Sequence, residues 1–74
     1  MEIAPRISVD ERVRFGRPVI SGTRVTVDLI LGKLPGGMKY DEIVKEYEVT
    51  LEDILACLDY AAKTISGEEI RAVG

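Results

Sequence analysis

The sequence predicts a single, mainly α domain: a core of three helices in helix-turn-helix order, preceded by short N-terminal β-strands and a hairpin. Apolar and polar residues alternate up to about residue 25, which is the period of a half-buried strand. From residue 26 onward, apolar residues recur every three or four positions, as on an amphipathic helix. Seventy-four residues suffice for one domain only, so residues 1–74 are taken as that domain.

The N-terminal third is expected to open with a loose terminus at residues 1–5 and to continue as a β segment at residues 6–25. Within that segment, the apolar residues that alternate with polar ones are expected to share one face of a ribbon: Ile7, Val9, Val13 and Phe15. Strands this short are not stable alone in water, so the ribbon needs a helix or a second copy of itself to cover it.

A tight hairpin turn is predicted at Ser21-Gly22. Glycine adopts positive φ without a steric cost, and this pair separates two short runs rich in β-branched residues, 18–20 and 23–25. Pro18 fixes its own φ and favours an extended Arg17 before it.

Residues 26–65 are expected to form the three helices. Thr26 suits the N-cap of the first helix, and Pro35-Gly36-Gly37 ends it. The second helix is expected at 40–47, with Tyr40 and Tyr47 on its apolar, core-packing face.

The third helix is expected to follow Thr50, which forms a variant of the capping box with Asp53 three residues later. It is expected to end at Ser66-Gly67, so that residues 66–74 form a frayed C-terminal tail. Tyr60 lies off the main apolar stripe of this helix and is therefore a candidate for a dimer or partner contact.

The net charge of −3 hides two oppositely charged parts. Residues 1–24 hold five arginines against three acidic residues, whereas residues 25–74 hold five basic and ten acidic residues. This division is typical of a nucleic-acid arm on an acidic body, and equally of two faces that pair across a dimer.

The residue types argue against a disulfide, a metal site, a catalytic site and a membrane span. Cys57 is the single cysteine and histidine is absent, which excludes an internal disulfide and argues against a zinc site or any other metal site or cofactor. The acidic pairs 41–42 and 52–53 fall in first helical turns, where a dipole or capping role explains them, so neither enzymatic activity nor a small-molecule substrate is expected. No apolar run is long enough for a signal peptide or membrane span, and a cytoplasmic protein is expected.

One stretch resembles the signature of a known family. Residues 16–27 read GRPVISGTRVTV, which is similar to the pattern G-R-P-x-I-x-G-T-R-I-x-V of the small prokaryotic proteins called domain of unknown function 433. The later residues Gly37, Asp41-Glu42-Ile43, Tyr47 and Thr50 to Ile54 are similar to the rest of that pattern, and the resemblance spans about Ile7 to Lys63. Tyr40 departs from it, because the family usually has a small cap residue such as Ser there.

The resemblance implies a homeodomain-like helix-turn-helix preceded by short β-strands. It also implies an antitoxin of the VapB type, which pairs with a PIN-like nuclease toxin and represses its own operon. No cofactor is implied.

Operator DNA is one expected partner. The first turn of the third helix carries Glu52 and Asp53, and the DNA phosphates would repel these carboxylates. The arginine-rich ribbon of a dimer is therefore expected to bind the DNA instead. The candidate DNA contacts are the basic residues of the ribbon and of the first interhelical turn: Arg12, Arg14, Arg17, Arg24, Lys33 and Lys39.

Protein partners are the other expectation. A chain this short is only marginally stable alone, which favours a homodimer, and an antitoxin arginine on the C-terminal tail or at Arg6 would pair with nuclease carboxylates. The candidate dimer or partner contacts are Ile7, Val9, Phe15, Tyr60 and Arg71. The alternative is a protein-interaction module with no DNA-binding activity.

Overall fold

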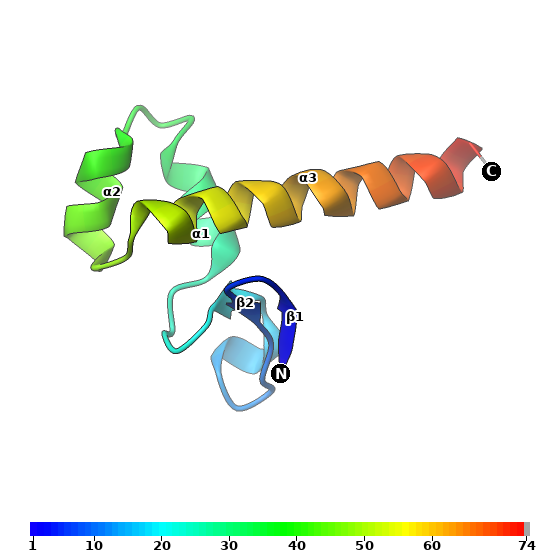
Figure 1. Cartoon of the computed structure of the whole chain (residues 1–74), viewed down its shortest axis with the longest axis horizontal. Helices are drawn as coiled ribbons and strands as arrows, with labels where there is room; N and C mark the ends of the chain where they lie inside the picture. Colours follow the sequence, from blue (N-terminus) through cyan, green and yellow to red (C-terminus); the bar gives the residue numbers. More distant parts are fainter. Residues whose placement is uncertain (74) are drawn as a thin grey trace.

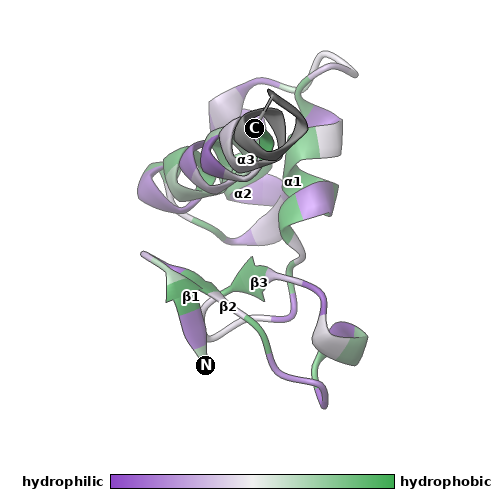
Figure 2. Ribbon diagram, turned by 90° about the vertical axis from the view of Figure 1, so that its right-hand side faces the viewer, coloured by the Kyte–Doolittle hydropathy of each residue, from purple (hydrophilic) through white to green (hydrophobic). Residues whose placement is uncertain are grey.

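The computed structural model describes the backbone of residues 1–73 and the side chains of residues 1–67. A small three-stranded sheet forms one layer and three helices form the other (Figures 1 and 2). The helices hold about half of the residues, so the prediction of a mainly α chain with an N-terminal β segment is confirmed.

The sheet is antiparallel with strand order β1-β2-β3, formed by β1 (Glu2–Ala4), β2 (Ile7–Ser8) and β3 (Val19–Ile20). The expected loose terminus at residues 1–5 is therefore wrong. The Met1 ammonium donates to the Val9 carbonyl, and the Val9 N–H donates back to the Met1 carbonyl, both at 2.9 Å. This reciprocal pair extends the ladder to the first residue.

The turn at Ser21-Gly22 is confirmed, with Gly22 at a φ of 79° and the Thr23 N–H donating to the Ile20 carbonyl at 3.0 Å. The expected second strand at residues 23–25 is wrong. The Thr23 hydroxyl donates to the Ile20 carbonyl and accepts from the Val25 N–H, which bends the backbone out of the ladder. Only an isolated bridge between Val19 and Thr26 remains.

The expected continuation of the ribbon through Val13 and Phe15 is also wrong. Residues Arg14–Gly16 form the short 3-10 turn η1, which follows an isolated bridge between Asp10 and Val13. Phe15 has a φ of 57° and a ψ of 37°, and its side chain points into solvent. The alternation of buried and exposed side chains therefore ends where Arg14 and Phe15 adopt the left-handed backbone conformation.

The helices are α1 (Val27–Lys33), α2 (Tyr40–Tyr47) and α3 (Leu51–Val73), and all three start as predicted. At the start of α2, the Lys39 N–H donates to the Glu42 carboxylate at 2.8 Å, which caps the helix despite the missing small residue. Tyr47 packs against the core, but Tyr40 is 44% exposed, so the prediction of core packing is wrong for Tyr40.

The expected end of the third helix at Ser66-Gly67 is wrong, because α3 continues to Val73 and projects beyond the rest of the molecule (Figure 1). Its 23 residues correspond to a length of about 35 Å at the usual rise per residue. The expected tail at residues 66–74 therefore lies largely on a helix.

One hydrophobic core joins the two layers. Its buried members come from both strands and helices: Ile7, Ile20, Val27, Ile30, Ile43, Val49, Ile54 and Cys57. Each fully buried aliphatic side chain contributes about 1.5–3 kcal/mol. The core fixes the sheet under α1 and α3, and so sets where the exposed residues between the layers lie.

Candidate interaction surface

Two of the four arginines predicted to contact DNA lie beside acidic neighbours, Arg12 in a close pair and Arg17 in a looser one. Arg12 donates to both carboxylate oxygens of Asp10, at 3.2 Å from Nε and 3.1 Å from Nη2. These hydrogen bonds hold the pKa of Asp10 below its usual range and raise that of Arg12. Arg17 lies 3.5 Å from Asp28, with both side chains about two-thirds exposed, at 66% and 69%.

The other two arginines, Arg14 and Arg24, are joined by a hydrogen bond from a side chain to a backbone carbonyl. The Arg14 Nε donates to the Arg24 carbonyl at 3.2 Å. This hydrogen bond joins the η1 turn to the segment that leads into α1. Among the residues that the structure describes, neither Arg14 nor Arg24 is in an ion pair. The side chains of these two arginines are therefore available to bind an external anion.

The six predicted DNA contacts do not form one surface. Arg12, Arg14, Arg17 and Arg24 lie in segment 10–24 beside the sheet. Lys33 is the last residue of α1 and Lys39 precedes α2, at the α1–α2 connection on the opposite side of the molecule (Figures 1 and 2). Both lysines thus lie apart from the arginines.

The five predicted dimer or partner contacts are also distributed over different environments. Ile7 is fully buried in the core, so its place among the contact residues is wrong. Val9 is half-buried in the sheet, whereas Tyr60 is half-buried beside a groove. Arg71 lies outside the residues whose side chains are described. Phe15 remains as the most exposed, at 99%.

Phe15 is presented on a strained turn. Arg14 and Phe15 both have positive φ, at 53° and 57°, a conformation that costs a side-chain-bearing residue about 1–3 kcal/mol. The turn is closed by the Arg17 N–H, which donates to the Arg14 carbonyl at 3.2 Å. A fully exposed aromatic ring on a strained backbone adds nothing to the stability of its own chain, which is typical of a contact residue.

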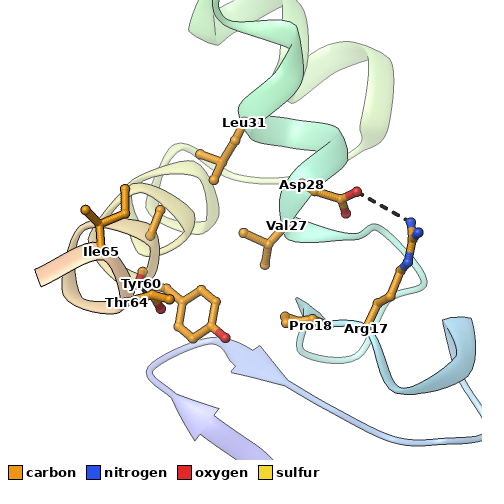
Figure 3. Close-up of a pocket in the computed structure, with 9 residues that line it drawn as sticks. Arg17, Pro18, Val27, Asp28, Leu31, Tyr60, Thr64 and Ile65 are labelled. Atoms are coloured by element: carbon orange, nitrogen blue, oxygen red, sulfur yellow. Dashed lines mark hydrogen bonds and ion pairs between the residues drawn. The ribbon is translucent and has the colours of Figure 1, made fainter. Parts of the chain in front are cut away.

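An apolar groove of about 440 Å³ lies between α1, α3 and the start of β3. Val27 and Leu31 line its α1 wall, while Tyr60 and Ile65 line its α3 wall (Figure 3). Pro18 forms the floor, and the Arg17–Asp28 pair closes one rim (Figure 3). This groove forms where residues 60–65 of α3 lie beside α1. The sequence alone does not reveal it, because it depends on how the two helices pack.

A second apolar surface, the α3 stripe, consists of Leu51, Leu55, Leu58 and Ala62. Their spacing of four, three and four residues places them along one face of the helix. Leu51 and Leu55 are 45% and 49% exposed, and Ala62 is also exposed. Leu58 is half-buried and packs against the core beside Ile54 and Cys57, whereas Leu51, Leu55 and Ala62 are exposed and available to another molecule.

The acids at the start of α3 have separate roles. Asp53 accepts from the Thr50 N–H at 2.9 Å and from Arg6 at 3.0 Å, and its own N–H donates to the Thr50 hydroxyl at 3.1 Å. Burial opposes the charge of Asp53, but the hydrogen bonds from Thr50 and Arg6 outweigh it and lower the pKa of this carboxyl. Glu52 remains exposed beside the α3 stripe.

Nothing in the described part of the chain gathers three or more side chains suited to a metal ion. Burial, together with the nearby Asp53 charge, raises the pKa of the Cys57 thiol to about 11, so this thiol stays protonated and unreactive at neutral pH. Across the residues described, no helix is both long and apolar enough to cross a membrane.

Comparisons with known proteins agree with this architecture. A family model described as "Protein of unknown function (DUF433)" matches residues 7–61. The X-ray crystal structure of Rv2018 from Mycobacterium tuberculosis is similar, with a TM-score of 0.65 and 31% sequence identity. The match covers 70% of this chain and 24% of that chain, so this chain spans about a quarter of the length of Rv2018. No curated protein matches.

Proposed function

This chain belongs to the DUF433 family of proteins of unknown function, and we propose that it is an antitoxin-like regulator. In this proposal, a homodimer in the cytoplasm binds a PIN-like nuclease toxin and contacts its own operator DNA. The helix order supports a homeodomain-like helix-turn-helix: α2 and α3 are joined by residues 48–50 only, and Glu48 turns the chain with a φ of 55°.

The observation that supports a protein partner most strongly is the α3 stripe. Two of its leucines, Leu51 and Leu55, are about half exposed on a rigid helix, and exposed apolar faces of this kind mark protein contacts. Glu52 lies beside the stripe and Asp59 follows on the same side, where it pairs with Lys63 at 2.9 Å, and the chain as a whole carries a net charge of −3. A partner with a basic, amphipathic segment complements this surface, and the basic substrate-binding face of a nuclease has that charge.

Co-purification tests the proposal. The chain is co-expressed with an adjacent reading frame of the PIN-like class, and capture of that protein with loss of its nuclease activity is the expected result. Leu55→Asp introduces a charge into the α3 stripe and is expected to abolish capture. Tyr40→Asp is the matched control, since Tyr40 is exposed to a similar extent but lies on α2. No capture by the wild type would remove the toxin partner.

DNA binding is the second part of the proposal, and Arg14 and Arg24 are the residues that favour it. The Arg14 side chain contacts the backbone of Arg24, and the described residues offer neither arginine an ion-pair partner. Arg12 is paired with Asp10, and Arg17 lies 3.5 Å from Asp28, which favours the alternative of a protein-interaction module without DNA-binding activity.

A mobility-shift titration with the gene's own promoter at two salt concentrations separates these two functions. Binding that weakens as salt rises is expected for contacts between arginines and phosphates. A chain that captures its partner yet shifts no promoter DNA at micromolar concentration is an interaction module only.

A further inference from the structure

We propose that the groove between α1 and α3 receives Phe15 of a second copy of this chain, so that two copies form a reciprocal dimer. This inference deepens the dimer of the proposed function and rests on it. It assigns the contact to residues outside the α3 stripe, which stays free for another protein.

The first support is the chemistry of the two parts. Phe15 is 99% exposed, so its ring is not packed against the described residues, while the groove offers about 440 Å³ between mainly apolar side chains. Val27, Leu31 and Ile65 form its walls, and Tyr60 supplies an aromatic edge (Figure 3). A phenylalanine ring fits a cavity of this size and lining.

The second support is their arrangement. Phe15 lines a neighbouring hollow that also includes Arg17 and Asp28, and the same two residues form the rim of the groove. Phe15 and the groove therefore lie on the two sides of this ion pair. A twofold axis near the pair places each Phe15 over the groove of the other copy, which is the self-complementary contact that closed dimers require.

The third support is charge. The Arg17–Asp28 distance of 3.5 Å and the high exposure of both side chains make this a loose pair that is free to exchange partners. Across a twofold axis, Arg17 of one copy faces Asp28 of the other, and the second pair forms in the opposite direction. One basic and one acidic group beside the axis of each copy are complementary to the same two groups of the other copy.

The contact is expected to be small. Two phenylalanine rings bury about 400 Å² in total, and the two groove surfaces bury a similar area. A sum of about 800 Å² lies below the size of standard stable interfaces, so association in the micromolar range is expected.

Charge reversal on separate chains is the deciding experiment. Arg17→Asp leaves only acidic groups at the axis, and Asp28→Arg leaves only basic groups, so each variant alone is expected to be monomeric in sedimentation at 100 µM. An equimolar mixture restores both pairs and is expected to form a heterodimer. Circular dichroism checks that both variants fold. Single variants that stay dimeric, or a mixture that stays monomeric, would overturn the proposal.

Phe15→Ala provides a second, independent measurement. Loss of a buried aromatic anchor is expected to weaken dimerisation at least about tenfold, whereas Tyr40→Ala, which removes an exposed aromatic ring from α2, leaves it unchanged. A wild-type dimer that Phe15→Ala does not weaken overturns this inference and leaves the proposed dimer and its nuclease partner in place. A wild-type monomer at 100 µM overturns the inference together with the dimer, while capture of the nuclease is still measured separately.

Discussion

The Arg6 guanidinium donates to the Asp53 carboxylate across 3.0 Å, joining the turn between β1 and β2 to the first turn of α3. The two residues are 47 positions apart in the sequence. Asp53 also closes a capping box with Thr50. One carboxylate thus stabilises the start of the longest helix and fixes the sheet against it.

Asp53→Ala is expected to lower the free energy of unfolding by about 2 kcal/mol, because it removes the cap and the contact with Arg6 together. Arg6→Ala should cost less than about 1 kcal/mol, since Arg6 is half-exposed and solvent screens the pair. Urea unfolding followed by circular dichroism measures both. Equal losses in the two variants would contradict the dominant role of the cap.

Because the pKa of Asp53 is lowered in the folded protein, the free energy of unfolding depends on pH in the acid range. The unfolded chain binds the proton more readily than the folded one, so this contribution is complete above the unfolded pKa of about 3.9 and disappears as the pH falls through the lower, folded value. Asp53→Asn removes the titrating group and is expected to flatten the loss of stability between about pH 5 and pH 3. Denaturant midpoints across this range test it, and an unchanged slope in Asp53→Asn would refute it.

Cys57 is expected to be inert in the folded protein. Its side chain is fully buried and its pKa is raised to about 11. A thiol-reactive chromophore at pH 8 should therefore label native protein only through unfolding, and should label it at once in denaturant. Rapid labelling of the native protein would show that the α3 side of the core opens readily.

Phe15→Gly should stabilise the monomer by about 1 kcal/mol, because glycine adopts the left-handed conformation without strain and the exposed ring contributes no burial. Phe15→Ala retains the strain and is the control. Gly22→Ala should act in the opposite direction and destabilise by about 1 kcal/mol, because Gly22 has a φ of 79°. Thermal unfolding at submicromolar concentration, below the dimer range, compares the three variants.

The DNA-binding proposal predicts unequal effects for the basic residues. Arg14→Ala combined with Arg24→Ala should weaken promoter binding and reduce its salt dependence, because these arginines keep free charge on one side of the molecule. Lys33→Ala combined with Lys39→Ala removes the same charge from the opposite side and should leave binding unchanged. Mobility shifts at two salt concentrations compare the pairs, and an equal loss in both would place DNA elsewhere.

Sequence reasoning located the helix starts well because each has a local signal. Thr26 and Thr50 precede apolar-periodic runs, and the helices begin at the next residue in both cases. The end of α3 was missed because Ser66-Gly67 is only a weak stop. A glycine within a helix costs about 1 kcal/mol, and Gly67 keeps negative φ within the continuous helix.

The site was harder to predict than the fold. Phe15 was selected as a contact for the wrong reason, since its predicted strand is a left-handed turn and the exposed ring follows from that turn. The groove depends on packing between α1 and the later turns of α3, which no local pattern reveals. Likewise, the pairing of Arg12 with Asp10 depends on the bend at Asp10, so the arginines looked more available than they are.

The position of Ile7 has a consequence for how the protein is made. This residue near the start of the chain is fully buried in the same cluster as Ile54 and Cys57. A ribosome releases the sheet first, but its buried face has no cover until the beginning of α3 has emerged. We therefore expect the sheet to stay unfolded until the beginning of α3 has left the ribosome, so that a ribosome stalled before that point leaves a product open to proteases.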